Sequence, residues 1–182
     1  MMDWSDFQST TYNLAYSTVA FVDNVGNAEI NGLELDATYK PNDTLTLSGY
    51  VVSNDPSLSE DYYDVSGVLQ ANSGNRLAYV PELSYVLGLD KVLSIFGMPG
   101  YMSIDYSYTG DRYTSQANEL KLPSYAIANM RVGVESNNRS MEVFISNLTD
   151  ENGYLSRYND FGDIRRTQNR PRVIGLRFKY RY

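Results

Sequence analysis

The side chains that could do chemistry in this sequence are carboxylates, arginines and 17 tyrosines, because the chain contains no histidine and no cysteine. The missing histidine removes the commonest general base, the Ser-His-Asp triad and most zinc sites. The missing cysteine removes disulfides and thiolate metal sites. We therefore expect no catalytic residue, no metal site and no cofactor, and a lipid acyltransferase or hydrolase is the least favoured interpretation.

Three carboxylates lie close together at Glu60, Asp61 and Asp64 and raise the question of calcium binding. They lack the glycine-containing ligand loop of an EF-hand. A solvated acidic loop is the better interpretation of this segment.

The bulk properties limit the fold and the partners. The 182 residues suffice for one domain with a core, and the net charge of −7 argues against nucleic acid or anionic lipid as a partner. No stretch resembles a membrane helix, since Asp90, Lys91 and Pro99 interrupt the most apolar region, 86–102. Residues 1–8 lack the basic start and apolar run of a signal peptide. For an outer-membrane protein we would therefore expect a removed signal or a longer parent chain.

Strands must position these side chains, and residues 171–182 show the strand pattern most clearly. Side chains alternate faces along a strand, which puts Arg177, Lys179 and Arg181 on a polar face. The other face is apolar and ends at the last residue: Ile174, Leu176, Phe178, Tyr180 and Tyr182. A chain that ends on an aromatic residue inside a strand is typical of a transmembrane β-barrel, whereas soluble sheets usually have polar, frayed ends.

The same alternation predicts strands at about 1–8, 28–40, 44–53, 82–91, 101–109, 125–135 and 140–148, with a further short candidate at 14–22. The apolar faces of these strands, drawn from Leu33 to Tyr39 in the second strand and from Leu83 to Leu89 in the fourth, carry no charged residue, and neither do those of the other strands after residue 40. We expect the charges of the polar face to pair across neighbouring strands. This applies above all to Arg131, Glu135, Glu142 and Arg177.

The connections alternate in length. Segments 9–27, 54–81 and 149–170 are long, 110–124 is intermediate, and the remaining connections at 41–43, 94–100 and 136–139 are short. This pattern predicts an all-β, antiparallel transmembrane β-barrel meander of about eight strands. The alternative is a soluble sandwich or lipocalin-like barrel with its apolar face inward, because alternation alone does not distinguish inside from outside. Aromatic residues near strand ends favour the membrane: Tyr39, Tyr85, Tyr108, Tyr180 and Tyr182.

Several short motifs follow one another in a specific order. They are Trp4-Ser5-Asp6-Phe7-Gln8, Asn24-Val25-Gly26-Asn27-Ala28 with Gly32-Leu33-Glu34, Leu45-Thr46-Leu47-Ser48-Gly49-Tyr50, Asn147-Leu148-Thr149-Asp150-Glu151, and Arg170-Pro171-Arg172 before the aromatic last strand. Together they resemble the C-terminal part of a TonB-dependent outer-membrane receptor. The resemblance implies a plugged barrel of about 22 strands. Residues 1–182 would supply its last eight strands as a partial barrel, without the plug domain or the TonB-binding segment.

The resemblance implies active uptake of a scarce ligand, such as a ferric siderophore, across the bacterial outer membrane. TonB would act only through the missing N-terminal part, so this piece could not transport alone. The alternative is a complete small eight-stranded outer-membrane barrel with a structural or adhesive role.

The resemblance also implies that extracellular loops hold the ligand. Arginine and tyrosine suit anionic, aromatic iron chelates, through bidentate hydrogen bonds and stacking. The alternative is that these loop residues are simply solvated. The candidates are Arg112, Tyr113, Arg157, Tyr158, Arg165 and Arg166, with Tyr62, Tyr63 and Arg76 beside them.

The last strand has further expected partners. We expect it to lie antiparallel to 140–148, with Phe178 and Tyr180 facing outer-membrane lipid. We also expect Phe178, Tyr180 and Tyr182 to engage the barrel-assembly machinery. Strands 1–8 and 173–182 would expose open backbone edges that cannot persist in lipid, so we predict that this polypeptide alone does not insert stably.

Overall fold

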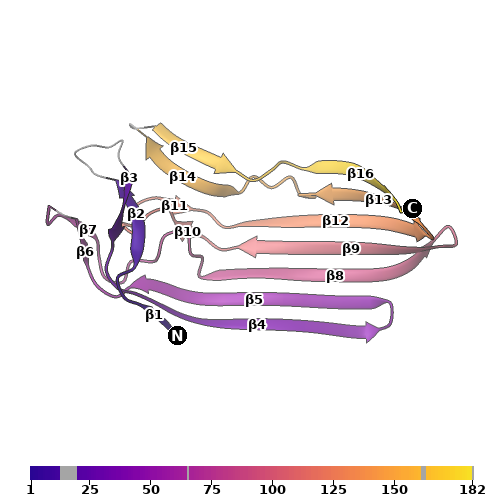
Figure 1. Cartoon of the computed structure of the whole chain (residues 1–182), viewed down its shortest axis with the longest axis horizontal. Coiled ribbons are helices and arrows are strands. Elements are labelled where there is room, and N and C mark those ends of the chain that lie inside the picture. The colour runs from indigo at the N-terminus through magenta and orange to yellow at the C-terminus, as the bar shows by residue number, and fades with distance from the viewer. Residues whose placement is uncertain (13–19, 65, 161–162, 182) are drawn as a thin grey trace.

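The computed structural model describes residues 1–12, 20–64, 66–160 and 163–181. Its main element is an eight-stranded antiparallel sheet in the order β1-β4-β5-β8-β9-β12-β13-β16 (Figure 1). Each long strand pairs with the next long strand along the chain, which confirms the predicted all-β meander. The strands are β1 (Met2–Trp4), β4 (Ala28–Asn42), β5 (Leu45–Leu58), β8 (Leu83–Ile95), β9 (Met98–Thr109), β12 (Tyr125–Ser136), β13 (Arg139–Ser146) and β16 (Val173–Tyr180).

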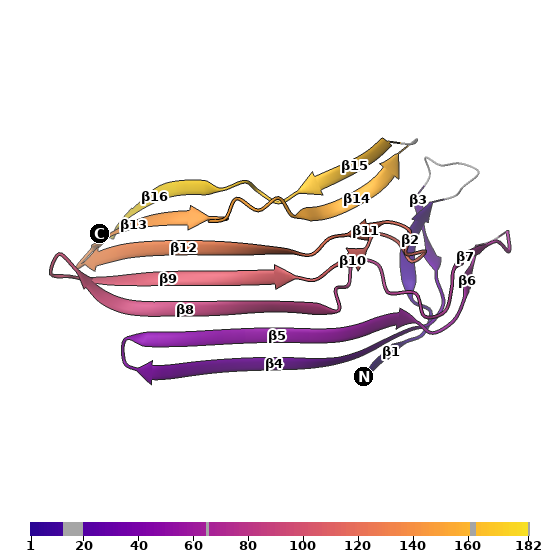
Figure 2. The same ribbon diagram turned by 180° about the vertical axis from the view of Figure 1, so that it is seen from behind.

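Four small hairpins extend from one end of this sheet, and tight turns close the other end (Figures 1 and 2). The predicted alternation of long and short connections is therefore confirmed. The hairpins are β2 (Gln8–Tyr12) with β3 (Ala20–Asn24), β6 (Tyr62–Tyr63) with β7 (Leu69–Ala71), β10 (Arg112–Tyr113) with β11 (Lys121–Leu122), and β14 (Tyr154–Asp160) with β15 (Asp163–Gln168).

Several strand ends differ from the sequence prediction. β5 continues to Leu58 instead of ending at 53, and β8 and β9 leave only Phe96 and Gly97 as their turn. The segments predicted as loops at 54–81, 110–124 and 149–170 contain strands. β1 spans three residues rather than eight, and β16 ends at Tyr180. Most of the candidate strand at 14–22, and Tyr182, lie outside the described residues.

The register places like residues in rows across the sheet. One row reads Leu47, Leu89, Ile104, Met130, Ile145 and Ile174 through β5, β8, β9, β12, β13 and β16. The neighbouring row reads Thr46, Asp90, Ser103, Arg131, Phe144 and Gly175. A slip of one residue in any strand would exchange the two faces, so both faces fix the register.

The apolar face of the sheet is left uncovered. Leu33 is 72% exposed and Leu176 is 71% exposed. The buried apolar cluster lies instead at the bases of the hairpins and consists of Val25, Ala28, Leu58, Tyr62, Ala71 and Leu77. A soluble sandwich would bury this face against a second layer, which the described residues do not form.

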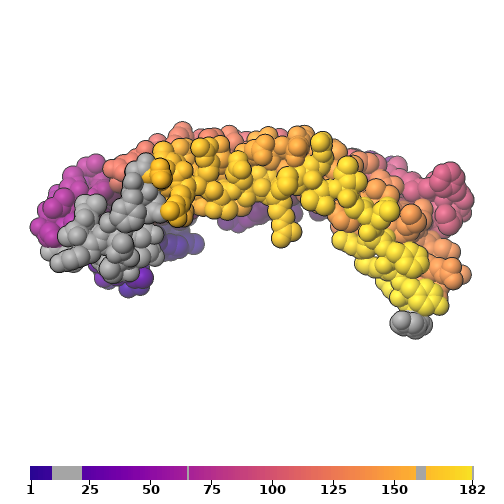
Figure 3. Space-filling view, turned by 90° about the horizontal axis from the view of Figure 1, so that it is seen from above, coloured from indigo at the N-terminus to yellow at the C-terminus, as the bar shows by residue number. Residues whose placement is uncertain are grey.

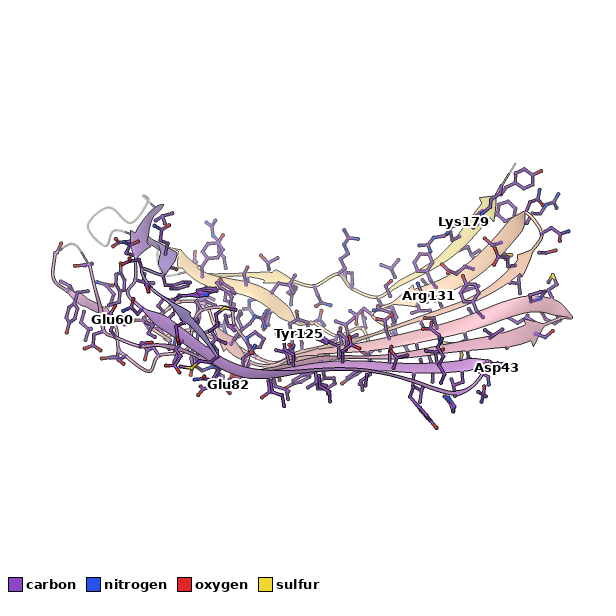
Figure 4. The ribbon with its side chains drawn as sticks, turned by 60° about the horizontal axis from the view of Figure 1, so that its bottom comes forward. Asp43, Glu60, Glu82, Tyr125, Arg131 and Lys179 are labelled. Atoms are coloured by element: carbon purple, nitrogen blue, oxygen red, sulfur yellow. The ribbon has the colours of Figure 1, made fainter. Side chains whose placement is uncertain are left out.

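The sheet is arched and has a hollow side (Figure 3). Arg131 and Lys179 lie on that side in Figure 4. β1 covers only Ala28–Ile30 of β4, and β16 pairs only with β13 among the described strands. Both edges are thus open, as a partial barrel requires. No helix of the described residues is long and apolar enough to cross a membrane.

Candidate ligand-binding surface

A polar cluster lies on the hollow face where β9, β12, β13 and β16 meet. Glu142 accepts hydrogen bonds from the Tyr101 hydroxyl at 2.5 Å and from Arg177 Nη1 at 2.6 Å. This confirms the expected pairing of Glu142 with Arg177. Arg131 does not pair with a carboxylate as expected; its Nη2 donates to Ser103 Oγ at 3.1 Å. Glu135 makes no ion pair with the part of the chain that the structure describes.

Two glycines make room for this cluster. A Cβ on Gly133 would lie 2.7 Å from Tyr101 Cζ, and a Cβ on Gly175 would overlap the Phe144 ring. The Tyr101 and Phe144 rings therefore lie against glycines of the neighbouring strands. A hollow of about 280 Å³ remains beside them, lined on this face by Asp105, Asn129, Arg131, Glu142 and Arg177.

A second network joins the segments before β8 and after β9 at the hairpin end. Arg76 Nη1 donates to Asp111 Oδ2 at 2.9 Å, and Lys121 Nζ lies 3.0 Å from the same oxygen. The Tyr113 ring lies under both cations, 5.4 Å from the Arg76 guanidinium and 6.0 Å from Lys121 Nζ. Two predicted ligand residues, Arg76 and Tyr113, thus meet here.

The side chain of Asn118 completes that network. Its Oδ1 accepts from Arg76 N at 2.9 Å, and its Nδ2 donates to Arg76 O at 2.8 Å. The amide therefore pairs with the backbone of Arg76 as a neighbouring strand would. The hydrogen bonds from Lys121 and Arg76 hold the pKa of Asp111 below its usual range, and the Asp111 carboxylate raises the pKa of Lys121.

Arg112 is buried, with 6% of its surface exposed. Its Nη2 donates to the carbonyl oxygens of Tyr154 and Leu155 at 3.1 and 3.3 Å, and its guanidinium lies 5.6 Å from the Tyr125 ring centroid. These contacts fix β10 against the start of β14. Arg112 is therefore enclosed by the hairpins and is not a solvated loop residue.

The hairpin β14–β15 sorts the remaining candidates onto two faces. A β-bulge between Tyr154 and Ser156 places Tyr154 opposite Gln168 and Arg157 opposite Arg166. Residues that are paired across a hairpin share a face, so Tyr154, Arg157 and Arg166 lie together. Tyr158 and Arg165 pair on the other face.

The predicted tyrosines of the β6–β7 hairpin have different environments. Tyr62 is buried at 5% exposure and donates its hydroxyl to Asp23 Oδ2, whereas Tyr63 is exposed. The acidic residues nearby accept backbone amides. Asp61 accepts from Ser73 N at 2.7 Å, and Asp64 accepts from Ser66 N and Val68 N. Within the described ranges no group of three or more acidic residues is placed to hold a metal ion.

Sequence reasoning missed Asp111, Lys121, Tyr125 and Tyr154 as members of these networks. Asp111 stands directly before Arg112, and Lys121 lies in the same predicted loop. This proximity was a signal for an ion pair, but it did not identify Arg76, 35 residues away, as the second cation.

Comparisons with known proteins agree with the geometry. A family model described as TonB dependent receptor-like, beta-barrel matches residues 2–148. The ferric yersiniabactin uptake receptor FyuA from Yersinia pestis aligns with a TM-score of 0.79 and 17% identity, covering 98% of this chain and 26% of that chain. The siderophore receptor PiuA from Acinetobacter baumannii aligns with a TM-score of 0.72 and 21% identity over 88% of this chain and 23% of that chain.

A copper transporter, OprC, aligns with a TM-score of 0.68 and 15% identity over 98% of this chain and 27% of that chain. At these identities the structural likeness concerns the fold alone. The chain spans about a quarter of the length of the structures that it matches.

Proposed function

Because this chain belongs to the TonB dependent receptor-like β-barrel family, whose members are outer-membrane receptors and not enzymes, we propose that it forms part of the wall of a receptor for a scarce extracellular ligand. The family assignment confirms the transmembrane interpretation of the sheet. It also removes the soluble sandwich, in which the exposed apolar face would have been buried.

The observation that carries the proposal is the common register of the apolar rows, together with the gathering of all four hairpins at one end. The apolar rows suit lipid contact across the whole sheet. The hairpin end then faces outward and carries the candidate ligand residues: Arg112, Tyr113, Arg157, Tyr158, Arg165 and Arg166.

The remaining parts of the receptor belong to the same proposal. Further strands would pair with the open edges of β4 and β16, and a plug domain would fill the lumen beside the polar cluster. TonB would act through that missing part. We keep Phe178, Tyr180 and Tyr182 as the proposed contact with the barrel-assembly machinery.

The ligand class is proposed from the matched structures. Two of the three are a ferric yersiniabactin uptake receptor and a siderophore receptor, and the third is a copper transporter. A metal chelate, with a ferric siderophore first, is therefore the ligand to test. Arginine and tyrosine at the hairpin end suit its negative charge and its aromatic rings.

An immunoblot of native outer membranes tests whether the chain is part of a larger barrel. We would raise an antibody against residues 149–170 and compare the band with the 20.6 kDa of this chain. A much larger band supports the receptor. A 20.6 kDa band in the membrane fraction would instead favour the small eight-stranded barrel, and the uptake proposal would then fall.

Uptake is tested in iron-limited cells. We expect deletion of the gene segment that encodes this chain to abolish growth on at least one ferric chelate, and the intact gene to restore it. Equal accumulation of radioactive iron with every chelate in deletion and parent strains would contradict the proposal.

A further inference from the structure

Three arginines gather around one tyrosine at the meeting of the β10–β11 and β14–β15 hairpins. Arg112 Nη2 donates to the Tyr154 carbonyl oxygen at 3.1 Å. Arg166 Nη1 donates to the Tyr154 hydroxyl at 2.8 Å, and its guanidinium lies 5.3 Å from the ring centroid. Arg157 lies 6.0 Å from the same centroid and donates from Nη1 to the Lys121 carbonyl oxygen at 3.2 Å.

Among the residues whose side chains the structure describes, no carboxylate pairs with any of these three arginines. Their partners are carbonyl oxygens, one hydroxyl and aromatic rings. Elsewhere in the chain arginines do pair with acids: Arg76 with Asp111 and Glu82, Arg172 with Asp150, and Arg177 with Glu142. Asp111, the acid next to Arg112 in sequence, already pairs with Arg76 and Lys121.

Two donors of this cluster are buried without a hydrogen-bond partner, Arg112 Nη1 and Arg157 Nε. A buried donor without a partner costs free energy, and like charges placed directly opposite in a hairpin repel each other. Arg157 and Arg166 occupy such opposite positions. The cluster is therefore a set of prearranged cations that a negatively charged group would stabilise.

We propose that Arg112, Arg157 and Arg166 form a binding site for an oxyanion, a carboxylate or phosphate group. The anion would enter beside Arg166, which is exposed, and bridge to the half-buried Arg157. Arg112 lies behind them as a fixed positive charge. Guanidinium groups bind such oxygens bidentately, which suits a planar or tetrahedral oxyanion better than a neutral ligand.

The inference deepens the proposed function and rests on it, because it assigns a chemical group to the ligand of the hairpin end. The same chemistry also belongs to the phosphate of a membrane lipid headgroup. The chain has a net charge of −7, so attraction of an anion here is a local property of these arginines and not of the whole surface.

The test uses the intact protein that carries this chain, purified in detergent, with inorganic phosphate and citrate as soluble probes. Binding is measured by isothermal titration calorimetry at low ionic strength. The variant is the double substitution Arg157→Gln and Arg166→Gln. The matched control is the double substitution Arg170→Gln and Arg181→Gln, which removes the same two charges at exposed positions outside the cluster.

We expect at least one probe to bind, the double variant to bind it about tenfold or more weakly, and the control to be unchanged. Equal binding by the double variant, or no binding of either probe, would overturn the inference. Because Arg112 is buried, it is left intact in this test, and unchanged thermal unfolding of the double variant shows that the fold is retained.

A second experiment distinguishes the two possible sources of the oxyanion, a lipid headgroup and a soluble ligand. Phosphate-bearing lipid that copurifies with the wild type and is lost from the double variant identifies a lipid headgroup. Loss of chelate uptake by the double variant, without loss of lipid, identifies a soluble ligand. If phosphate and citrate fail to bind while chelate uptake persists, the inference falls and the proposed function remains. If uptake is absent while the double variant loses phosphate binding, the site remains and the proposed function falls.

Discussion

Glu142 and Arg177 stand directly opposite each other on β13 and β16, and a 2.6 Å hydrogen bond joins Glu142 Oε1 to Arg177 Nη1. The two side chains differ in environment, since the Glu142 side chain is 9% exposed and that of Arg177 is 51% exposed. Removing Arg177 therefore leaves a buried carboxylate, whereas removing Glu142 leaves a half-exposed guanidinium. Because of this asymmetry, the two substitutions should differ in their effect on stability.

We expect Arg177→Gln to destabilise the protein more than Glu142→Gln. The first change leaves a buried carboxylate that is held only by Tyr101, whereas the second leaves a half-exposed guanidinium that water can solvate. Breaking a fully buried pair costs about 3–5 kcal/mol, so we expect roughly 2 kcal/mol for Arg177→Gln and less than about 1 kcal/mol for Glu142→Gln. Urea unfolding of the intact protein in detergent measures both. Equal costs would contradict this account.

Gly133 gives a second prediction about the same cluster. A Cβ there would lie 2.7 Å from Tyr101 Cζ, so Gly133→Ala must displace the ring and break the hydrogen bond from Tyr101 to Glu142. We expect a loss of about 1–3 kcal/mol, as for other overpacked sites. The control is Gly49→Ala, where the nearest atom, Leu87 Cδ2, is 3.5 Å away. A control that is as destabilised as Gly133→Ala would show that strand glycines in general, and not the Tyr101 contact, carry the effect.

The alternation of side chains made the eight-stranded sheet predictable from sequence. Lipid excludes charge from one face of every spanning strand, so Leu87 and Val86 could be assigned to opposite faces before any pairing was known. The tight turns were predictable from the residue types at their centres. Asn137 adopts a φ of 45° and Gly97 a φ of 79°, which are conformations that these residue types tolerate in short hairpins.

The hairpin end was less predictable, because its strands are mostly short and mix polar with apolar residues, so alternation carries little signal there. Residues 54–58 continue β5 although Asn54, Asp55 and Pro56 are turn-forming types. A single bulge after Tyr154 decides that Arg157 shares a face with Tyr154 and lies opposite Arg166. Such a one-residue shift depends on pairing partners, which one sequence does not reveal.

Val86 and Leu87 test which face meets lipid. The two residues are neighbours on β8 with nearly equal exposure, 45% and 47%. Leu87→Lys puts a cation among the apolar rows and should cost up to about 2–4 kcal/mol in a bilayer, depending on depth. Val86→Lys puts it on the polar face and should cost roughly 1 kcal/mol or less. The heat-modifiable folded fraction of the intact protein after refolding into vesicles measures the difference between the two variants.

A soluble protein would show no such contrast, since two equally exposed positions accept lysine equally well. Comparable folding of the two variants would therefore count against the lipid-facing assignment of the Leu87 row. The comparison does not depend on the absolute stability of the barrel, because both variants add the same side chain to the same strand.

Asp111 carries a prediction about the hairpin end and its pH dependence. Its pKa is lowered from 3.8 by hydrogen bonds with Lys121 and Arg76, so its contribution to stability is complete above pH 3.8 and is lost as the pH falls through the lowered pKa. The pKa of Lys121 is raised from 10.5, so its contribution persists below pH 10.5 and is lost above it. The contribution of this network to stability should thus be constant from pH 5 to pH 9.

Asp111→Asn should loosen the network throughout that range. The Tyr79 amide donates to the Tyr113 carbonyl oxygen and the Thr114 amide donates to that of Leu120, so both amides report its closure. We expect faster hydrogen exchange at both in Asp111→Asn, and a smaller increase in wild type at high salt, because Asp111 is more than a third exposed and is screened. The matched control is Glu119→Gln, which removes a carboxylate of the same segment that makes no ion pair among the described residues. Equal acceleration in Glu119→Gln would show that net charge, and not the hydrogen bonds of Asp111, holds the two segments together.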